Sequence, residues 1–255
     1  MQNTITKWKR KIWPKRHDLS KWVYNDDGFA VRKKTVDFLK DPAFLNAWET
    51  SKLMNTEAWK TGVPDVRWRA HTCCWAAKHG LLLDGDFVEC GVFTGLYSVT
   101  LAHFLDFAKV NKKLWLFDTY NGIPVDTAPA VEARSGSTSG ASSIKNTLYF
   151  DCYELAQRNF KPFPNAHLVR GILPASFDQI ELSRIAYLSV DLNHAPSEKA
   201  VIEFLWPKLS PGAIVVIDDY AWPGHHAQYE MWNTFAASKG EMVLTLPTGQ
   251  GLLIK

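Results

Sequence analysis

The chain from residue 86 onward alternates short apolar runs with segments of helical character. Runs with little polar alternation are typical of strands covered on both faces, as in a parallel sheet. We predict strands at seven such runs, at 87–90, 114–118, 166–170, 185–190, 213–217, 242–246 and 251–255. We predict crossover helices at 95–109, 146–159, 196–206 and 225–239. This order predicts a doubly wound, mostly parallel α/β sheet of seven strands.

The last two runs are joined only by Pro-Thr-Gly-Gln at 247–250. This connection is too short for a parallel crossover, so it predicts an antiparallel hairpin at the C-terminal end of the sheet. Five helix-separated strands followed by an antiparallel pair resemble the strand inventory of the class I methyltransferase sheet.

Residues 1–80 form a different region, rich in Trp and charge, with helix-like stretches at 28–40, 42–60 and 66–79 and no evident strand pattern. We therefore expect an N-terminal helical lid or accessory region over 1–80 and one α/β domain over 81–255. Within that domain, thirteen of the twenty-one residues at 125–145 are Ala, Gly, Ser or Thr. Such a segment buries little, and it predicts either a surface insertion or a mobile loop that closes over a ligand.

Composition narrows the class of protein. A chain of 255 residues that is 46% apolar and 22% charged fits one soluble α/β domain with additions. The net charge of +3 is too small to predict a nucleic-acid partner, and eleven Lys or Arg against four Asp place the basicity in residues 1–40. No apolar run is long enough for a membrane span or a secretory signal, so we expect a cytoplasmic protein without stable membrane insertion.

The first predicted strand ends in the sequence VECGVFTG, where Glu89, Gly91 and Gly95 fall at a strand-to-helix turn. Glycine permits a sharp bend and a close approach to a ligand, although a tight turn alone explains the same pattern. The third glycine of the dinucleotide fingerprint is missing, which argues against a pyrophosphate. Asp118 ends the second strand, where an acid can accept hydrogen bonds from a ribose. Adenosine without pyrophosphate points to S-adenosylmethionine.

A second group of acids follows the fourth and fifth strands. Asp191 ends one strand and Asp218 with Asp219 ends the next, so a parallel sheet brings all three to one crevice. Three carboxylates at one place repel one another unless a cation neutralises them. Because their donor atoms are all oxygen, they favour a hard cation, Mg²⁺ first, followed by Mn²⁺ or Ca²⁺. Helix capping is the structural alternative for such aspartates. His194, three residues after Asp191, is the first candidate for a catalytic histidine.

The motifs VECGVFTG, FDTYNGIP, IAYLSVDLN, LSPGAIVVIDDY and LPTGQGLLIK, in this order, resemble the macrocin-type O-methyltransferase family over roughly residues 66–255. The segment DVRWRAHTCCWAAKHG is similar to the branch that methylates 6-deoxyhexoses at the 3-hydroxyl. This resemblance implies a class I methyltransferase fold, S-adenosylmethionine as donor, a Mg²⁺-type ion, a sugar hydroxyl as acceptor, an N-terminal helical lid and a homodimer or larger homo-oligomer.

The resemblance also implies a set of site residues. Metal ligands are expected at Asp191, Asp218 and Asp219, and catalytic residues at Asp191 and His194. The cofactor-binding residues are expected to be Glu89, Gly91, Val92, Phe93, Thr94, Gly95 and Ser98 at the methionine end, Asp118 and Thr119 at the ribose, and Gly171 and Ile172 at the adenine. One position departs from the family: where better-known members carry a second Asp as the general base, this chain has Asn193. The general base is then Asp191, His194 or metal-bound water. Alternatively, the metal alone acidifies the acceptor hydroxyl and no separate base is needed.

The predicted function is a metal-dependent sugar O-methyltransferase acting on a deoxyhexose, a nucleotide-sugar or a glycoside. A methyltransferase for catechols or other vicinal diols would use the same acids, since such diols also chelate a metal. The Asn193 departure favours a third interpretation, in which the chain binds S-adenosylmethionine and acts as a non-catalytic partner protein. A nicotinamide dehydrogenase is the least favoured, because the glycine pattern does not fit it.

Overall fold

The computed structural model describes residues 22–59, 61–123 and 150–255 of the 255-residue chain. The basic N-terminal segment and the predicted loop at 125–145 lie outside the described residues. Among the described residues, no helix is both long enough and apolar enough to cross a membrane.

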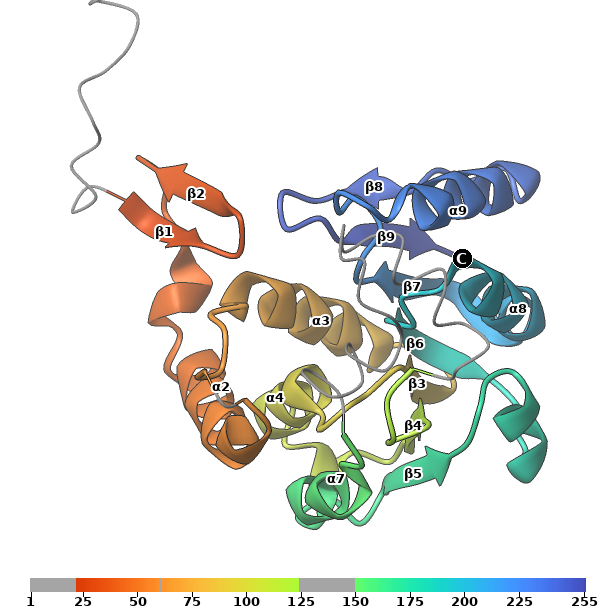
Figure 1. Cartoon of the computed structure of the whole chain (residues 1–255), viewed down its shortest axis with the longest axis horizontal. Coiled ribbons are helices and arrows are strands. Elements are labelled where there is room, and N and C mark those ends of the chain that lie inside the picture. Colours follow the sequence, from red (N-terminus) through yellow and green to blue (C-terminus); the bar gives the residue numbers. More distant parts are fainter. Residues whose placement is uncertain (1–21, 60, 124–149) are drawn as a thin grey trace, which may run out of the picture.

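A seven-stranded sheet forms the centre of the molecule, in the order β5-β4-β3-β6-β7-β9-β8 (Figure 1). The first five of these strands run parallel, and β9 runs antiparallel to both of its neighbours. This is the predicted doubly wound sheet with its antiparallel hairpin. The strands are β3 (Asp86–Cys90), β4 (Leu114–Asp118), β5 (Ala166–Arg170), β6 (Ile185–Val190), β7 (Leu209–Ile217), β8 (Leu244–Thr245) and β9 (Gly251–Ile254).

Helices cover both faces of the sheet, as Figure 1 shows, with α8 and α9 on one side and α3 and α4 on the other. Successive strand residues therefore enter different cores: Phe87 packs with the α3 and α4 side and Val88 with the α8 and α9 side, both fully buried. This two-sided burial explains the unbroken apolar runs. The α-helices of the domain are α3 (Arg67–Gly80), α4 (Leu96–Phe104), α7 (Tyr153–Phe160), α8 (Ala195–Leu205) and α9 (His226–Ser238), with 3-10 turns at η4 (Phe107–Lys109), η6 (Ala175–Gln179) and η7 (Trp206–Lys208).

Helix α2 (Pro42–Asn55) packs against α4, outside the sheet. Pro42 occupies its first turn, and the Asp41 side chain caps it by accepting a hydrogen bond from the backbone N–H of Ala43 at 2.9 Å. The buried Ser51 hydroxyl donates to the carbonyl of Leu96 at 2.8 Å, which ties α2 to the start of α4. The 3-10 turns η2 (Asp37–Lys40) and η3 (Thr56–Ala58) flank the helix.

One prediction for the N-terminal region is wrong. The stretch 28–40 was predicted as helix, but β1 (Trp22–Asp26) and β2 (Phe29–Arg32) form an antiparallel hairpin. Asp27 and Gly28 make the turn with φ of 54° and 77°, a left-handed conformation that Asp-Gly adopts readily and that a helix cannot contain. The hairpin carries the apolar side chains of Tyr24 and Phe29 onto Trp68 of α3, with ring centroids 5.6 and 5.2 Å away.

Other element boundaries also differ from the predictions. The helix predicted over 95–109 ends at Phe104, and the one predicted over 42–60 ends at Asn55. Strand β7 begins at Leu209 rather than at 213, because its first residue still pairs with Ile185 of β6 before an irregularity in register. Strand β8 is confined to two residues of the predicted 242–246. Helix α7 begins at Tyr153, seven residues after the predicted start, and the first part of the predicted range, 146–149, lies outside the described residues.

Candidate active site

A cavity of about 990 Å³ opens at the C-terminal ends of β3, β4, β6 and β7. In a doubly wound sheet this edge is where ligands bind, beside the point at which the strand order reverses. Here the chain moves outward in one direction from β3 to β4 and in the other from β6 to β7. Residues of 57–59 and 61–69, which lead into and begin α3, supply part of the wall, including Trp59 and Arg69.

At Gly91 the backbone of the turn after β3 comes very close to the backbone of Asp191 in the cavity wall. The φ of Gly91 is +90°, and a Cβ built on it would collide with the backbone carbonyl oxygen of Asp191. Its own N–H donates to the carbonyl of Phe117 at 2.8 Å, so the ends of β3, β4 and β6 meet at this residue. Gly95, with φ of +87°, is the N-cap residue before α4, and a Cβ there would overlap the Phe160 ring. Both glycines are therefore required by the packing of the turn.

Asp118 at the end of β4 faces this turn. Its Oδ2 accepts hydrogen bonds from the backbone N–H groups of Val92 and Phe93 at 2.6 and 2.7 Å, and its Oδ1 accepts one from Tyr120 at 2.8 Å. A carboxylate has about four acceptor positions, of which these three backbone donors use three, and the Thr119 hydroxyl lies 3.3 Å from Oδ1 as well. Asp118 thus fixes the turn, and a ribose bound there would share the carboxylate with these backbone donors.

Glu89 lies behind the turn, 3% exposed, and accepts a short hydrogen bond from the Ser98 hydroxyl. The pKa of the Glu89 carboxyl is raised to about 8, chiefly by burial and also by the nearby carboxylates of Asp118 and Asp218, whereas the Ser98 hydrogen bond opposes the shift. The carboxyl is therefore protonated over most of the neutral range in the ligand-free protein. A cationic ammonium group reaching Glu89 from the cavity would favour its charged form.

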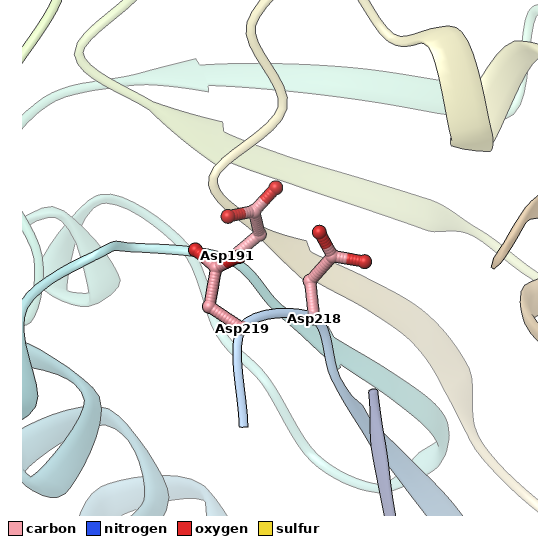
Figure 2. A group of neighbouring side chains, drawn as sticks. All are labelled: Asp191, Asp218 and Asp219. Carbon is pink, nitrogen blue, oxygen red and sulfur yellow. The ribbon is translucent and has the colours of Figure 1, made fainter. Parts of the chain in front are cut away.

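The three predicted metal-binding aspartates do meet. Figure 2 shows Asp191, at the end of β6, and Asp218 and Asp219, at the end of β7, with their carboxylates directed toward a common space. One oxygen from each carboxylate lies within 4.8 Å of the others. Burial raises the pKa of Asp191 well above its usual value, and Asp218 and Asp219 raise it further by repulsion. Three crowded oxygen donors of this kind suit a hard divalent cation.

Asp218 already has protein partners on both oxygens. Arg69 of α3 donates from Nη1 to its Oδ2 at 2.8 Å, and Gln250 donates to its Oδ1 at 3.0 Å. Arg69 also makes a two-pronged pair with Asp27, whose carboxylate accepts from Nε at 2.9 Å and from Nη2 at 2.8 Å. The Trp222 ring lies beneath the guanidinium, 5.1 Å from its carbon. Each oxygen of Asp218 keeps a lone pair for another ligand.

His194 caps helix α8. Its Nδ1 accepts a hydrogen bond from the backbone N–H of Ser197 at 3.4 Å and lies 2.8 Å from the Ser197 hydroxyl oxygen. Because a backbone N–H can only donate, the proton of the neutral ring then resides on Nε2. Asn193, the residue that departs from the family pattern, adopts φ of 57° and donates its amide to Oδ1 of Asp191 at 3.1 Å. Asn193 therefore orients Asp191 rather than taking up a proton.

Most of the predicted site residues line the cavity, and three lie behind its wall. The residues in the wall are Glu89, Gly91, Val92, Phe93, Asp118, Thr119, Gly171, Ile172, Asp191, His194, Asp218 and Asp219. Thr94, Gly95 and Ser98 are buried in the turn and the first residues of α4, where they support the wall.

Sequence reasoning missed several residues of the site. Trp59, Arg69 and Tyr97 line the cavity, and Asp27 and Gln250 contact its charged groups. The Asp-Gly pair at 27–28, flanked by Val-Tyr and Phe-Ala-Val, was an available signal for the hairpin that carries Asp27. Arg69 and Gln250 stand in two of the segments that carry the family resemblance, DVRWRAHTCCWAAKHG and LPTGQGLLIK, but nothing in those segments marks them as partners of Asp218. Trp59 and Tyr97 stand in ordinary loop and helix sequence.

The sequence profile described as macrocin-O-methyltransferase (TylF) matches residues 72–242. One similar protein is the 8-demethyl-8-(2,3-dimethoxy-alpha-L-rhamnosyl)-tetracenomycin-C 4'-O-methyltransferase of Streptomyces olivaceus, 28% identical over 145 residues, or 54% of this chain and 53% of that protein. Another is the demethyldecarbamoylnovobiocin O-methyltransferase of Streptomyces niveus, 27% identical over 141 residues and 53% of each chain. The chain thus spans about half the length of the curated relatives it matches.

Solved structures share the fold. The O-methyltransferase NovP superposes with a TM-score of 0.63 at 16% identity, covering 84% of this chain and 99% of NovP. The calicheamicin methyltransferase CalS11 gives a TM-score of 0.54 at 17% identity, covering 95% of this chain and 98% of its own. These similarities establish the class I methyltransferase architecture predicted from the strand order.

Proposed function

This chain belongs to the macrocin-O-methyltransferase family, and from that membership we propose that it transfers a methyl group from S-adenosylmethionine to a sugar hydroxyl. The observation that carries the proposal is the juxtaposition, in one cavity, of the Gly91 turn and the cluster of Asp191, Asp218 and Asp219. The name of the Streptomyces olivaceus relative specifies a rhamnosyl-bearing substrate, which supports a deoxyhexose as acceptor.

The donor would lie along the ends of β3 and β4. The Gly91 turn brings the backbone close to the methionine part, and buried Glu89 is placed to pair with its ammonium group. Asp118 and Thr119 lie where the ribose would fall, and Gly171 with Ile172 would border the adenine. The half-exposed Ile172, at 58%, offers an apolar surface that a purine ring would cover.

The aspartate cluster fits a divalent ion by the chemistry of its donors. Asp191, Asp218 and Asp219 supply oxygen atoms only, which favours Mg²⁺, Mn²⁺ or Ca²⁺ over softer metals. When bound, such an ion supplies Lewis-acid polarisation of the acceptor hydroxyl. The collision that a Cβ at 91 would make with the Asp191 backbone shows how closely the donor turn and this cluster are joined.

The protein's own groups have two further tasks, namely alignment of the acceptor oxygen and removal of its proton. Alignment is the larger one, because the sulfonium methyl group is already activated. Asn193 holds one oxygen of Asp191, and we assign proton uptake to the other oxygen of that carboxylate. His194, protonated at Nε2 when neutral, can donate a hydrogen bond from the cavity wall and so orient the acceptor.

The test measures S-adenosylhomocysteine formation with three acceptor probes: dTDP-L-rhamnose, methyl α-L-rhamnoside and 3,4-dihydroxybenzoate. We expect turnover with a rhamnoside, loss of turnover after EDTA treatment and recovery with Mg²⁺. Asp219→Asn should abolish this recovery, whereas Asp84→Asn, which changes an exposed acid remote from the cavity, should not.

Each alternative has its own outcome. Turnover of the catechol alone would identify a vicinal-diol methyltransferase and contradict the sugar acceptor. Binding of S-adenosylmethionine without methyl transfer to any probe would identify a non-catalytic partner protein. Full turnover with EDTA would remove the metal from the proposal while leaving methyl transfer in place.

We also propose a homo-oligomer and a cytoplasmic location. Family membership supports the first, and light scattering of the purified chain at several concentrations tests it. A monomer at all concentrations would contradict it. Cell fractionation tests the second.

A further inference from the structure

We propose that Asp27 and Arg69 are positioning residues that set the cation affinity of the aspartate cluster from outside it. Asp27 neutralises Arg69, and Arg69 then orients Asp218 without repelling the ion. The inference rests on the proposed function in one respect, namely that a divalent cation binds to the cluster. Both residues precede the segment 72–242 that matches the family profile, and although Arg69 lies in the segment DVRWRAHTCCWAAKHG, the resemblance described above assigns no role to either residue.

The contact geometry makes Arg69 a bridge between two carboxylates. It uses Nε and Nη2 for Asp27 and Nη1 for Asp218, with all three hydrogen bonds between 2.8 and 2.9 Å. All three side chains are almost enclosed, at 14% exposure for Arg69, 3% for Asp27 and 6% for Asp218. Planar, two-pronged pairing of this kind restricts both partners far more than a single surface ion pair does.

The proposed role of Asp27 is to offset the positive charge of Arg69. A guanidinium bonded to a metal ligand stands within a few ångströms of the ion and repels it, and at an effective dielectric constant of about 20 the repulsion is substantial. Asp27 places a full negative charge on the far side of the same guanidinium. The ion then faces a nearly neutral pair that still donates a hydrogen bond to Asp218.

Other groups around Arg69 do not supply this balance. Tyr97 adjoins the guanidinium and the cluster, but burial raises the pKa of its phenol well above the usual value, so it stays neutral. Trp222 lies against Arg69 as an uncharged ring. Burial is the largest influence on Asp27 and raises the pKa of its carboxyl, while Arg69 opposes that shift.

The β1–β2 hairpin holds Asp27 in a fixed position beside Arg69. Asp27 sits in the tight turn between β1 and β2, and the Tyr24 hydroxyl on β1 donates to the backbone carbonyl of Asp65 at 2.8 Å. Tyr24 and Phe29 pack edge-on against Trp68, the residue next to Arg69. The turn is therefore held against the start of α3 by contacts that do not involve the ion pair, so removing the charge of Asp27 leaves the hairpin with its apolar anchors.

The experiment measures Mn²⁺ binding by electron paramagnetic resonance of the free ion, with S-adenosylhomocysteine present and no acceptor. Four proteins form a cycle: wild type, Asp27→Asn, Arg69→Gln and the double variant. We expect Asp27→Asn to weaken Mn²⁺ binding by about tenfold or more, the scale found for outer partners of metal ligands. Arg69→Gln removes the positive charge and leaves the negative charge of Asp27 unneutralised, while the amide can still donate to Asp218, so this variant should bind Mn²⁺ more tightly than wild type by about threefold or more. The double variant, which removes both charges, should return to within about threefold of wild type.

The matched control is Arg67→Gln, at the first residue of α3, which removes a two-pronged pair with Asp65 in the preceding loop and lies outside the cavity wall. Its Mn²⁺ affinity should equal that of wild type. Thermal denaturation of each variant checks folding. If Asp27→Asn does not fold, Arg69→Gln alone decides, since tighter binding supports the proposal and unchanged or weaker binding overturns it.

The direction of each change in Mn²⁺ affinity distinguishes an electrostatic role of the Asp27–Arg69 bridge from a merely structural one. If the bridge only stabilised the fold, every variant of the cycle would bind Mn²⁺ more weakly than wild type, and the double variant would be the weakest. That result, or Asp27→Asn binding as tightly as wild type, overturns the inference. If wild type and Asp219→Asn both fail to bind Mn²⁺, the metal part of the proposed function falls first and this inference falls with it.

Discussion

Replacing Gly91 by Ala tests whether the close contact between the ends of β3 and β6 stabilises the site. The new Cβ collides with the carbonyl oxygen of Asp191, and the backbone φ of +90° is itself unfavourable for alanine. The conformational cost is about 1 kcal/mol or somewhat more. Relieving the collision requires shifting the end of a central strand, which we place at about 2 kcal/mol from the usual cost of overpacking. The expected total loss in the free energy of unfolding is about 3 kcal/mol. This loss is smaller than the stability of most domains, so the variant should still fold.

Gly240→Ala is the matched control. Gly240 follows α9 with φ of +77°, and a Cβ there meets nothing within 4 Å. This variant therefore carries the conformational cost without the collision, and it should lose about 1 kcal/mol. The difference of about 2 kcal/mol between the two variants isolates the contact between residue 91 and Asp191.

Urea denaturation with unchanged m values gives both free energies of unfolding. Calorimetric titration with S-adenosylhomocysteine provides a second measurement, since Gly91→Ala should weaken binding by about tenfold or more and Gly240→Ala should not change it. Equal destabilisation by the two substitutions, to within about 0.5 kcal/mol, together with unchanged binding, would refute the reasoning from the close approach at Gly91.

Two further predictions concern Glu89 and His194. The folded pKa of Glu89, about 8, lies above its ordinary value of 4.5, so this carboxyl contributes stability that is fully present below about pH 4.5 and is lost as the pH rises toward 8. Glu89→Gln should therefore reduce the fall in urea midpoint between pH 5 and pH 8 in the ligand-free protein, and an identical fall in both proteins would contradict the burial argument. His194→Ala should cost about 1 kcal/mol through loss of the cap on α8, whereas His194→Asn retains a capping oxygen and should keep wild-type stability. We expect His194→Asn to lower kcat by about tenfold or more, because it removes the Nε2 donor, and full turnover in that variant would limit His194 to capping.

The sheet could be predicted from the sequence because its strands are buried on both faces. The runs at 114–118, 166–170 and 185–190 match β4, β5 and β6 residue for residue. The start of β7 could not be predicted, since Pro211 and Gly212 interrupt the apolar pattern while Leu209 still pairs with its neighbour. Pairing partners decide such boundaries, and local sequence does not specify them.

The N-terminal hairpin was missed for a different reason. Its strands are short and half exposed, with a single buried side chain in β1 at Tyr24, so their apolar pattern is weak. The Asp27-Gly28 turn signal was present, yet the stretch 28–40 was interpreted as a helix. The hairpin is stabilised by Trp68, and a contact between segments so distant in the chain leaves no periodic signal.

The candidate site was predictable where strands end in acids and glycines. The topology of a parallel sheet brings Asp191, Asp218 and Asp219 to one edge, and the carboxylates do converge there. The partners of these acids were not predictable, because Arg69 and Gln250 reach Asp218 from a helix before the sheet and a turn at its last hairpin. Their selection depends on three-dimensional proximity alone.

The two partners of Asp218 have a consequence for how far a change elsewhere in the molecule can reach. Arg69 lies 149 residues before Asp218 in the sequence and Gln250 lies 32 residues after it, so the orientation of this one carboxylate depends on the packing of two separate segments. A substitution that shifts either the start of α3 or the turn before β9 would therefore alter the aspartate cluster without touching any of its three members.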